Sequence, residues 1–152
     1  MKLAEALLLR SDQQKQLASL KQRIEANVLI QEGDEPSEDP NVLLEQAFQL
    51  NSALQELIYQ IHRTNAAAHL VNGQALLKLL IQRDRYIEQH RILIATIQSS
   101  QSDAHRYSSR EIKWKKTITV SKIQLQADDI AHKLRELNMQ IQSANWQIEL
   151  MS

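Results

Sequence analysis

The chain has 152 residues, 43% hydrophobic and 24% charged, so it is large and apolar enough for one folded domain over residues 1–152. Its 18 basic residues balance its 18 acidic residues, which leaves no net field to attract nucleic acid or an anionic membrane. The sequence has no cysteine, which excludes disulfides, thiol catalysis and cysteine-ligated metals and favours a cytoplasmic protein.

The scarcity of residues that break helices predicts the fold class. Two Gly and two Pro are few for this length, and aromatic residues make up only 4% of the chain. A core built from Leu, Ile, Val and Ala is typical of helix bundles. We therefore predict a mainly α fold, an elongated bundle of about four long helices, with one β-strand near residues 110–120.

The first predicted helix covers residues 2 to about 30. Its apolar residues recur at helical spacing: Leu3, Leu7, Leu17, Leu20, Ile24 and Val28. Gln13 and Lys21 dilute this stripe, so we expect the helix at the edge of the bundle or against another subunit. The start of the chain does not resemble a signal peptide, because Glu5 interrupts a short apolar run.

The stretch QEGDEPSEDP, residues 31–40, is the clearest break in the pattern. Gly33 suits the end of a helix, and Pro40 suits the approach to the next one. Five carboxylates fall within eight residues: Glu32, Asp34, Glu35, Glu38 and Asp39. Oxygen-rich loops bind hard cations, but this one lacks the ligand spacing of an EF-hand. We predict no metal and no cofactor, and a loop that is solvated or faces a basic surface.

The second predicted helix runs from about 41 to 70. Its apolar residues form a heptad seam: Leu43, Ala47, Leu50, Leu54, Leu57 and Ile61. Near its end His62, Asn65 and His69 share one stripe, with Arg63 beside them. Two interpretations stay open: a polar network that fixes helix register, or the wall of a ligand pocket completed by Arg83 or Asp84.

Two further helices are predicted in the second half of the chain. The first covers about 74–99 and places Asp84 and Arg91 on its seam, among these apolar residues: Leu77, Leu80, Ile87, Ile94 and Ile97. The second opens at Ser121, with Gln124 as its capping-box partner. Its seam alternates steps of four and three to the end of the chain: Ile123, Ala127, Ile130, Leu134, Leu137, Ile141, Ala144 and Ile148.

The stretch REIKWKKTITV, residues 110–120, has the alternation of a β-strand, with one apolar face: Ile112, Trp114, Ile118 and Val120. It contains no turn signal, so it cannot form a hairpin by itself. We predict that it pairs antiparallel with a second copy across a two-fold axis, with the apolar face as the oligomer interface. Lys116 falls on that face, where its ammonium group can reach water.

The same stretch is basic, and a two-stranded ribbon can enter the major groove of DNA. The candidate contacts are Arg110, Lys113, Lys115 and Lys116. Overall neutrality disfavours nucleic acid as a partner, and the alternative is that the ribbon meets the acidic loop of the same or a neighbouring chain. A gel shift that weakens with salt would support nucleic-acid binding.

Several stretches together resemble a family of small bacterial proteins labelled septicolysin-like, which also occur among mobile gene-cassette proteins. They include MKLAEALLLRSDQQKQL, IHRTNAA, NGQALLKLLIQRD, RYSSREIKW and QADDIAHKLRELNMQIQSANWQIEL. The resemblance implies a mostly helical, oligomeric fold and brings no mechanism. The cytolysin activity suggested by the label finds no support in the sequence, which has no thiol and no apolar stretch of membrane length.

From these patterns we expect a cytoplasmic homo-oligomer that works as a protein-interaction or scaffold module. One alternative is a small-molecule binder or an enzyme with the polar pocket around His62, Asn65 and His69. The other is the basic β-ribbon that binds nucleic acid. No catalytic residue is assigned, so enzymatic activity stays an open question, and we predict no membrane partner.

Overall fold

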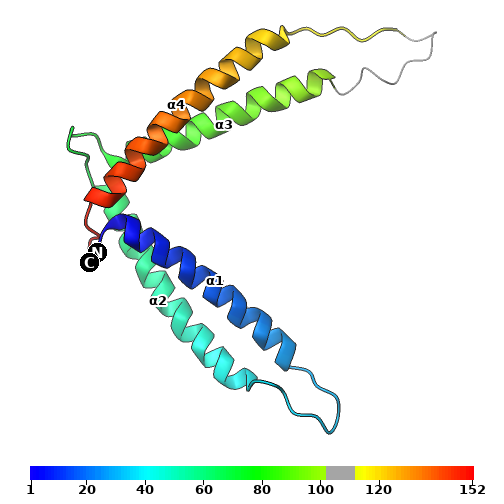
Figure 1. Cartoon of the computed structure of the whole chain (residues 1–152), viewed down its shortest axis with the longest axis vertical. Coiled ribbons are helices and arrows are strands. Elements are labelled where there is room, and N and C mark those ends of the chain that lie inside the picture. The colour runs from blue at the N-terminus through cyan, green and yellow to red at the C-terminus, as the bar shows by residue number, and fades with distance from the viewer. Residues whose placement is uncertain (102–111) are drawn as a thin grey trace. The chain divides into compact units, whose positions relative to one another are not determined.

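The computed structural model describes residues 1–101 and 112–152, and within them the chain forms four α-helices (Figure 1). These are α1 (Leu3–Asn27), α2 (Pro40–Ala67), α3 (Leu76–Gln101) and α4 (Val120–Gln147). The mainly α prediction is confirmed, and the described residues contain no β-sheet beyond one isolated bridge.

The chain divides into two compact units. The first comprises Met1–His69 together with Ala144–Ser152, and the second comprises Leu70–Ser143. The first unit thus takes in both ends of the chain and the last turn of α4. The organisation as one domain over residues 1–152 stays a prediction.

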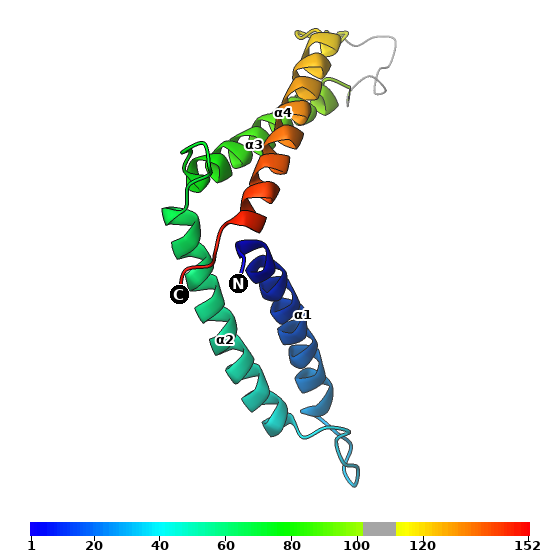
Figure 2. The same cartoon turned by 60° about the vertical axis from the view of Figure 1, so that its left-hand side comes forward.

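In the first unit, α1 and α2 lie side by side as a helical hairpin (Figures 1 and 2). Leu20 of α1 packs on Leu43 and Ala47 of α2, and partly buried apolar residues extend this cluster: Leu17, Ile24 and Leu50. The seam predicted for α2 is confirmed, because all of its members are buried except Leu50, which is half-buried. Val28, by contrast, follows the last residue of α1 and is exposed.

Polar contacts hold the turn between α1 and α2, residues 28–39, against the helix ends. Arg23 of α1 forms a two-pronged ion pair with Glu38. The Asn27 side chain bridges the two segments, since its amide donates to the Arg23 carbonyl at 2.8 Å and its oxygen accepts from the Glu38 N–H at 3.1 Å. Asp39 caps α2 by accepting from the Asn41 N–H at 2.9 Å, and Pro40 fills the first helical position.

The sequence suggested that Gly33 ends α1. In the structure α1 ends at Asn27, and Gly33 lies within the turn that follows. Its φ of +92° is a left-handed conformation that favours glycine. The Asp34 N–H donates to the Gln31 carbonyl at 3.0 Å and closes the turn around it.

In the second unit, α3 and α4 form a second hairpin. Leu79 packs on Leu137 and Ile141, with partly buried residues around them: Leu70, Leu80 and Tyr86. The seam predicted for α4 is confirmed for its members in this unit, which are all buried or half-buried.

The seam predicted for α3 is only partly correct, because Ile97 is buried and Leu80 and Ile94 are half-buried, but its other members are exposed. The residues that α3 buries are Leu76, Leu79 and Ile97, whereas Leu77 and Ile87 are exposed. Asp84 and Arg91, predicted on the seam, are exposed as well. The reason is that α3 carries apolar residues in adjacent pairs, so that its pattern fits two neighbouring faces and the contacts with α4 select between them.

Within residues 112–120, the described part of the predicted strand, no strand forms. Residues 112–119 have no regular structure, and α4 begins at Val120, one residue before the expected start at Ser121. The Thr119 carbonyl accepts from the N–H groups of Lys122 and Ile123 at 3.1 and 3.2 Å, so Val120 belongs to a helix and not to a strand. A strand needs a second backbone, so pairing between two copies stays a prediction. Arg110 lies outside the described residues.

We expect the replacement of Ile141 by Ala to lower the free energy of unfolding by about 2–5 kcal/mol, because this residue is 2% exposed within the α3–α4 core. The matched control is Leu77→Ala on α3, where the side chain is 43% exposed and a loss within about 0.5 kcal/mol is expected. Urea denaturation of both variants measures the difference. Equal losses would contradict the buried register of this hairpin.

Candidate functional site

The polar residues predicted to share one stripe of the second helix are divided by the end of α2. His62 and Arg63 are exposed on the helix, and Asn65 is half-buried. Because α2 ends at Ala67, His69 lies beyond it, with Nδ1 3.0 Å from the Ala67 carbonyl oxygen. The expectation that His69 continues the stripe is therefore wrong. Binding of a ligand by these residues stays a prediction.

The other two proposed pocket residues lie in the second unit. The Arg83 Nε stands 3.5 Å from an oxygen of the neighbouring Asp84 carboxylate. Arg83 is half-buried, while Asp84 is exposed. The pair is a contact between adjacent residues on α3, and it leaves the carboxylate open to water.

Thr64 is the polar residue that the α2 seam buries, and the sequence reasoning missed it. It is fully buried. Its hydroxyl donates to the Gln60 carbonyl at 2.8 Å and accepts from the Met151 N–H at 2.9 Å. The sequence did contain the signal for Thr64. The seam residues of α2 are spaced alternately by four and three positions, and the next step of three after Ile61 leads to position 64 and not to Asn65.

This hydrogen bond belongs to a set of contacts between the two ends of the chain, which we call the terminal clasp: Met1–Leu3 with Ile148–Leu150, and Thr64 with Met151. The Leu3 N–H donates to the Ile148 carbonyl and the Leu150 N–H to the Met1 carbonyl, each at 2.9 Å. They form an antiparallel bridge between Lys2 and Glu149. Figure 2 shows the C-terminal residues passing beside α2.

Charges reinforce the terminal clasp. The Lys2 ammonium group bonds the Glu149 carboxylate and holds the pKa of that carboxyl below its ordinary value. Lys2 also donates to the Gln147 carbonyl at 3.1 Å. On α2, Arg63 lies 5.7 Å from the centre of the Tyr59 ring and donates to the Ser152 carbonyl at 2.7 Å. Arg63, a candidate pocket residue, is therefore occupied in holding the C-terminal segment.

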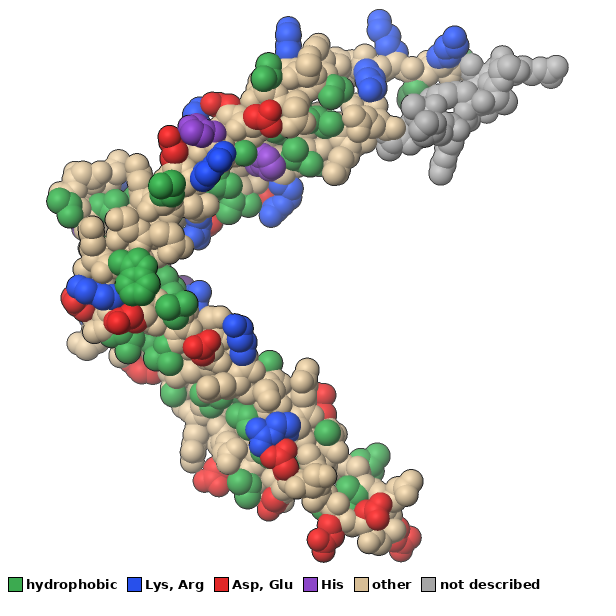
Figure 3. All heavy atoms as spheres, viewed as in Figure 1, with side chains coloured by type: hydrophobic (Ala, Val, Ile, Leu, Met, Phe, Trp, Pro, Cys, Tyr) green, Lys and Arg blue, Asp and Glu red, His purple; other side chains and the backbone are tan. Residues whose placement is uncertain are grey.

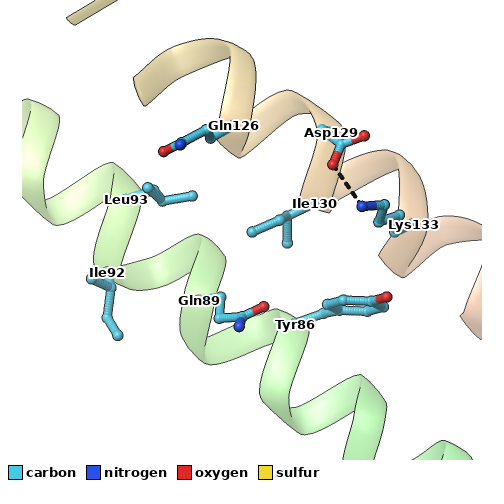
Figure 4. Close-up of a pocket in the computed structure, with 8 residues that line it drawn as sticks. All are labelled: Tyr86, Gln89, Ile92, Leu93, Gln126, Asp129, Ile130 and Lys133. Atoms are coloured by element: carbon cyan, nitrogen blue, oxygen red, sulfur yellow. Dashed lines mark ion pairs between the residues drawn. The ribbon is translucent and has the colours of Figure 1, made fainter. Parts of the chain in front are cut away.

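A groove with a volume of about 450 Å³ lies between α3 and α4 in the second unit (Figure 4). Its lining is mostly apolar and comes from both helices: Tyr86, Gln89, Ile92, Leu93, Gln126, Asp129, Ile130 and Lys133. Asp129 and Lys133 pair at 2.9 Å on α4, which raises the pKa of Lys133. The groove can hold an apolar group beside this ion pair.

The segment of residues 112–119, which we call the basic segment, exposes large apolar side chains. Ile112 is 93% exposed and Trp114 is 77% exposed. Lys113, Lys115 and Lys116 are exposed among them. Ile118 is half-buried. Figure 1 shows that this segment runs on beyond the N-terminal end of α4 instead of folding back over the helix.

The turn between α1 and α2 also exposes apolar side chains next to charged ones, but here the charges are acidic. Val28, Leu29 and Ile30 are all exposed, and Leu29 is 86% exposed. The acidic residues after them divide into two groups. The side chains of Glu38 and Asp39 hold the turn through hydrogen bonds. The other three are exposed, and within the described residues their carboxylates make no such bond: Glu32, Asp34 and Glu35. Figure 3 shows acidic side chains gathered at this end of the first unit.

The described residues contain no group of His, Asp and Glu side chains arranged to hold a metal ion. A membrane-spanning helix needs about 20 mostly apolar residues. None of the helices in residues 1–101 and 112–152 contains such a stretch.

Comparisons with known proteins agree with this fold and bring no activity. A family model described as "Family of unknown function (DUF6847)" matches residues 10–150, and the chain belongs to that family. A solved structure of a functionally unknown conserved protein from Corynebacterium diphtheriae is 33% identical, covers 99% of each chain and has a TM-score of 0.89. A search of curated proteins gave no match. Membership of the septicolysin-like family stays a prediction that these matches do not test.

We expect Thr64→Val to lower the free energy of unfolding by about 1 kcal/mol, because it leaves the partly buried Met151 N–H without its acceptor. Thr96→Val is the matched control, since the Thr96 hydroxyl makes the same bond to the carbonyl four residues before it, at 2.8 Å. Denaturation of both variants measures the two losses. If both variants lose the same stability, the Thr64 hydroxyl contributes only its hydrogen bond within α2 and not the one to Met151.

We expect stability to fall with pH as the two paired carboxylates Glu38 and Glu149 become protonated. Their pKa values are lower in the folded protein than in the unfolded chain, so the stability they contribute is fully present above about pH 4.3. It is lost as pH falls through the lower folded pKa values. Glu149→Gln should flatten this dependence, whereas Glu25→Gln at an exposed site on α1 should not. Unfolding measured from pH 7 to pH 3 tests both, and identical profiles would contradict the role of Glu149.

Proposed function

We propose that this member of the DUF6847 family is a cytoplasmic, homo-oligomeric protein-interaction module that assembles through the basic segment. The observation that carries the proposal is the exposure of Ile112 and Trp114 in a short stretch between two helices. Aromatic residues that are buried at an interface dominate binding energy. A second copy that covered this stretch would remove its largest apolar side chains from water.

We propose that the two copies associate by pairing their basic segments as antiparallel β-strands. Residues 112–119 keep the alternation of apolar and polar side chains, and two antiparallel copies would satisfy each other's backbone hydrogen bonds. Each copy would then offer the same backbone edge to its partner, as a two-fold interface requires. The pairing now ends at Thr119, because Val120 is the first residue of α4.

Exposed apolar residues on α3 support a role in interactions. Leu77, Ile81 and Ile92 are exposed and follow each other by steps of 4 and 11 residues. These steps return to nearly the same face of a helix. A second interaction face on α3 would suit a scaffold that binds another protein as well as itself.

Nucleic-acid binding is the second candidate, because Lys113, Lys115 and Lys116 are exposed around Trp114. Lysines interleaved with an aromatic residue suit phosphates and stacked bases. The balanced charge of the whole chain favours a protein partner instead. A shift of duplex or single-stranded nucleic acid at low salt that disappears at high salt would make this the leading function.

We expect the protein to elute as an oligomer in size-exclusion chromatography with light scattering. Trp114→Gln should weaken the association constant by about tenfold, because it removes a large apolar contact. Trp146→Gln on α4 is the matched control, since Trp146 is also exposed and lies outside the basic segment. A monomeric wild-type protein, or equal effects of the two substitutions, would contradict the proposed function.

A further inference from the structure

We propose that the turn between α1 and α2 of one copy docks on the basic segment of a second copy. This inference rests on the proposed function and deepens it by naming the surface that covers Ile112 and Trp114. The two surfaces belong to different hairpins, and every copy carries both. The turn of each copy can therefore dock on a second copy while its basic segment binds the turn of another.

The apolar side chains of the two surfaces match in kind and in exposure. Leu29 is the most exposed member of the group Val28, Leu29 and Ile30, which begins where α1 ends. Ile112 and Trp114 stand exposed in the basic segment. Each group is too short to form a core within its own turn, and burial of one against the other removes both from water.

The charges of the two surfaces are opposite and follow the apolar groups closely. The basic segment contains Lys113, Lys115 and Lys116 and no acidic residue. In an extended conformation Lys116 lies on the same face as Ile112 and Trp114. The turn places three exposed carboxylates within five residues after Ile30: Glu32, Asp34 and Glu35. One face therefore offers apolar groups beside a cation, and the other offers apolar groups beside anions.

Internal contacts leave these carboxylates available to a partner. Glu38 is paired with Arg23, and Asp39 caps α2, so the turn is held in place by the two acidic residues nearest to α2. A turn held in place in this way loses little conformational entropy when a partner binds. The three carboxylates that do not hold the turn are those nearest to the exposed apolar group.

Cysteine cross-linking tests the contact directly, because the chain has no cysteine of its own. Gln31→Cys and Thr117→Cys introduce thiols beside the two surfaces and keep their apolar side chains. When the two variants carry different tags and are mixed under oxidation, we expect a disulfide-linked heterodimer. A mixture of Val71→Cys with Thr117→Cys is the control, since Val71 is 95% exposed in the turn between α2 and α3.

The cross-links separate the second copy from other partners of the basic segment. No heterodimer from Gln31→Cys and Thr117→Cys, in protein that self-associates, would overturn the docking while the proposed function stands. A faster disulfide within one chain that carries both substitutions would assign the contact to the same copy and would also overturn it. A Thr117→Cys homodimer reports strand pairing and supports the proposed function on its own. A monomeric wild-type protein would overturn both proposals.

Charge exchange provides the second test. Lys116→Glu and Glu35→Lys should each weaken association by up to about fivefold at low salt, and a mixture of the two variants should restore it. Leu29→Asp should weaken it by about tenfold, while Val71→Asp should leave it unchanged. Sedimentation equilibrium measures these constants. Failure of the mixed variants to restore association, together with an unchanged constant for Leu29→Asp, would overturn the docking.

Discussion

A hairpin of two helices can bury only one stripe of each helix, and this constraint governs both units of the chain. The α1–α2 hairpin buries the seam that contains Leu43, Ala47 and Leu54, and the α3–α4 hairpin buries Leu79 against Leu137 and Ile141. Apolar residues outside these stripes have no place in either core. The exposed side chains on α3, in the turn after α1 and in the basic segment follow from this geometry.

The same constraint explains which elements could be predicted from the sequence. α2 and α4 each carry one clean apolar seam, so their buried faces follow from spacing alone. α3 carries adjacent apolar pairs, and the choice between its two faces depends on α4, which no local pattern contains. Thr64 was missed although the seam led to it, because a threonine is not counted as apolar until its hydroxyl is known to be satisfied.

The terminal clasp could not be predicted from the sequence, for a different reason. Its hydrogen bonds join Met1–Leu3 to Ile148–Leu150 across most of the chain, and no spacing rule relates positions so far apart. It gives Arg63 and Thr64 a structural task at the end of α2. His62, Asn65 and His69 were grouped by helical period, but the end of α2 at Ala67 separates His69 from the other two.

The chain is neutral overall, but its charges are separated in a way that the proposed assembly would use. The turn between α1 and α2 is acidic and the basic segment is cationic, although basic and acidic residues balance at 18 each. A chain with one sign of charge repels its own copies, whereas separated patches of opposite sign attract them in a defined orientation. Ion pairs at such surfaces contribute little energy each. In the proposed docking, the apolar groups beside them, centred on Leu29 and Trp114, would therefore supply affinity, and the charges would select which surfaces meet.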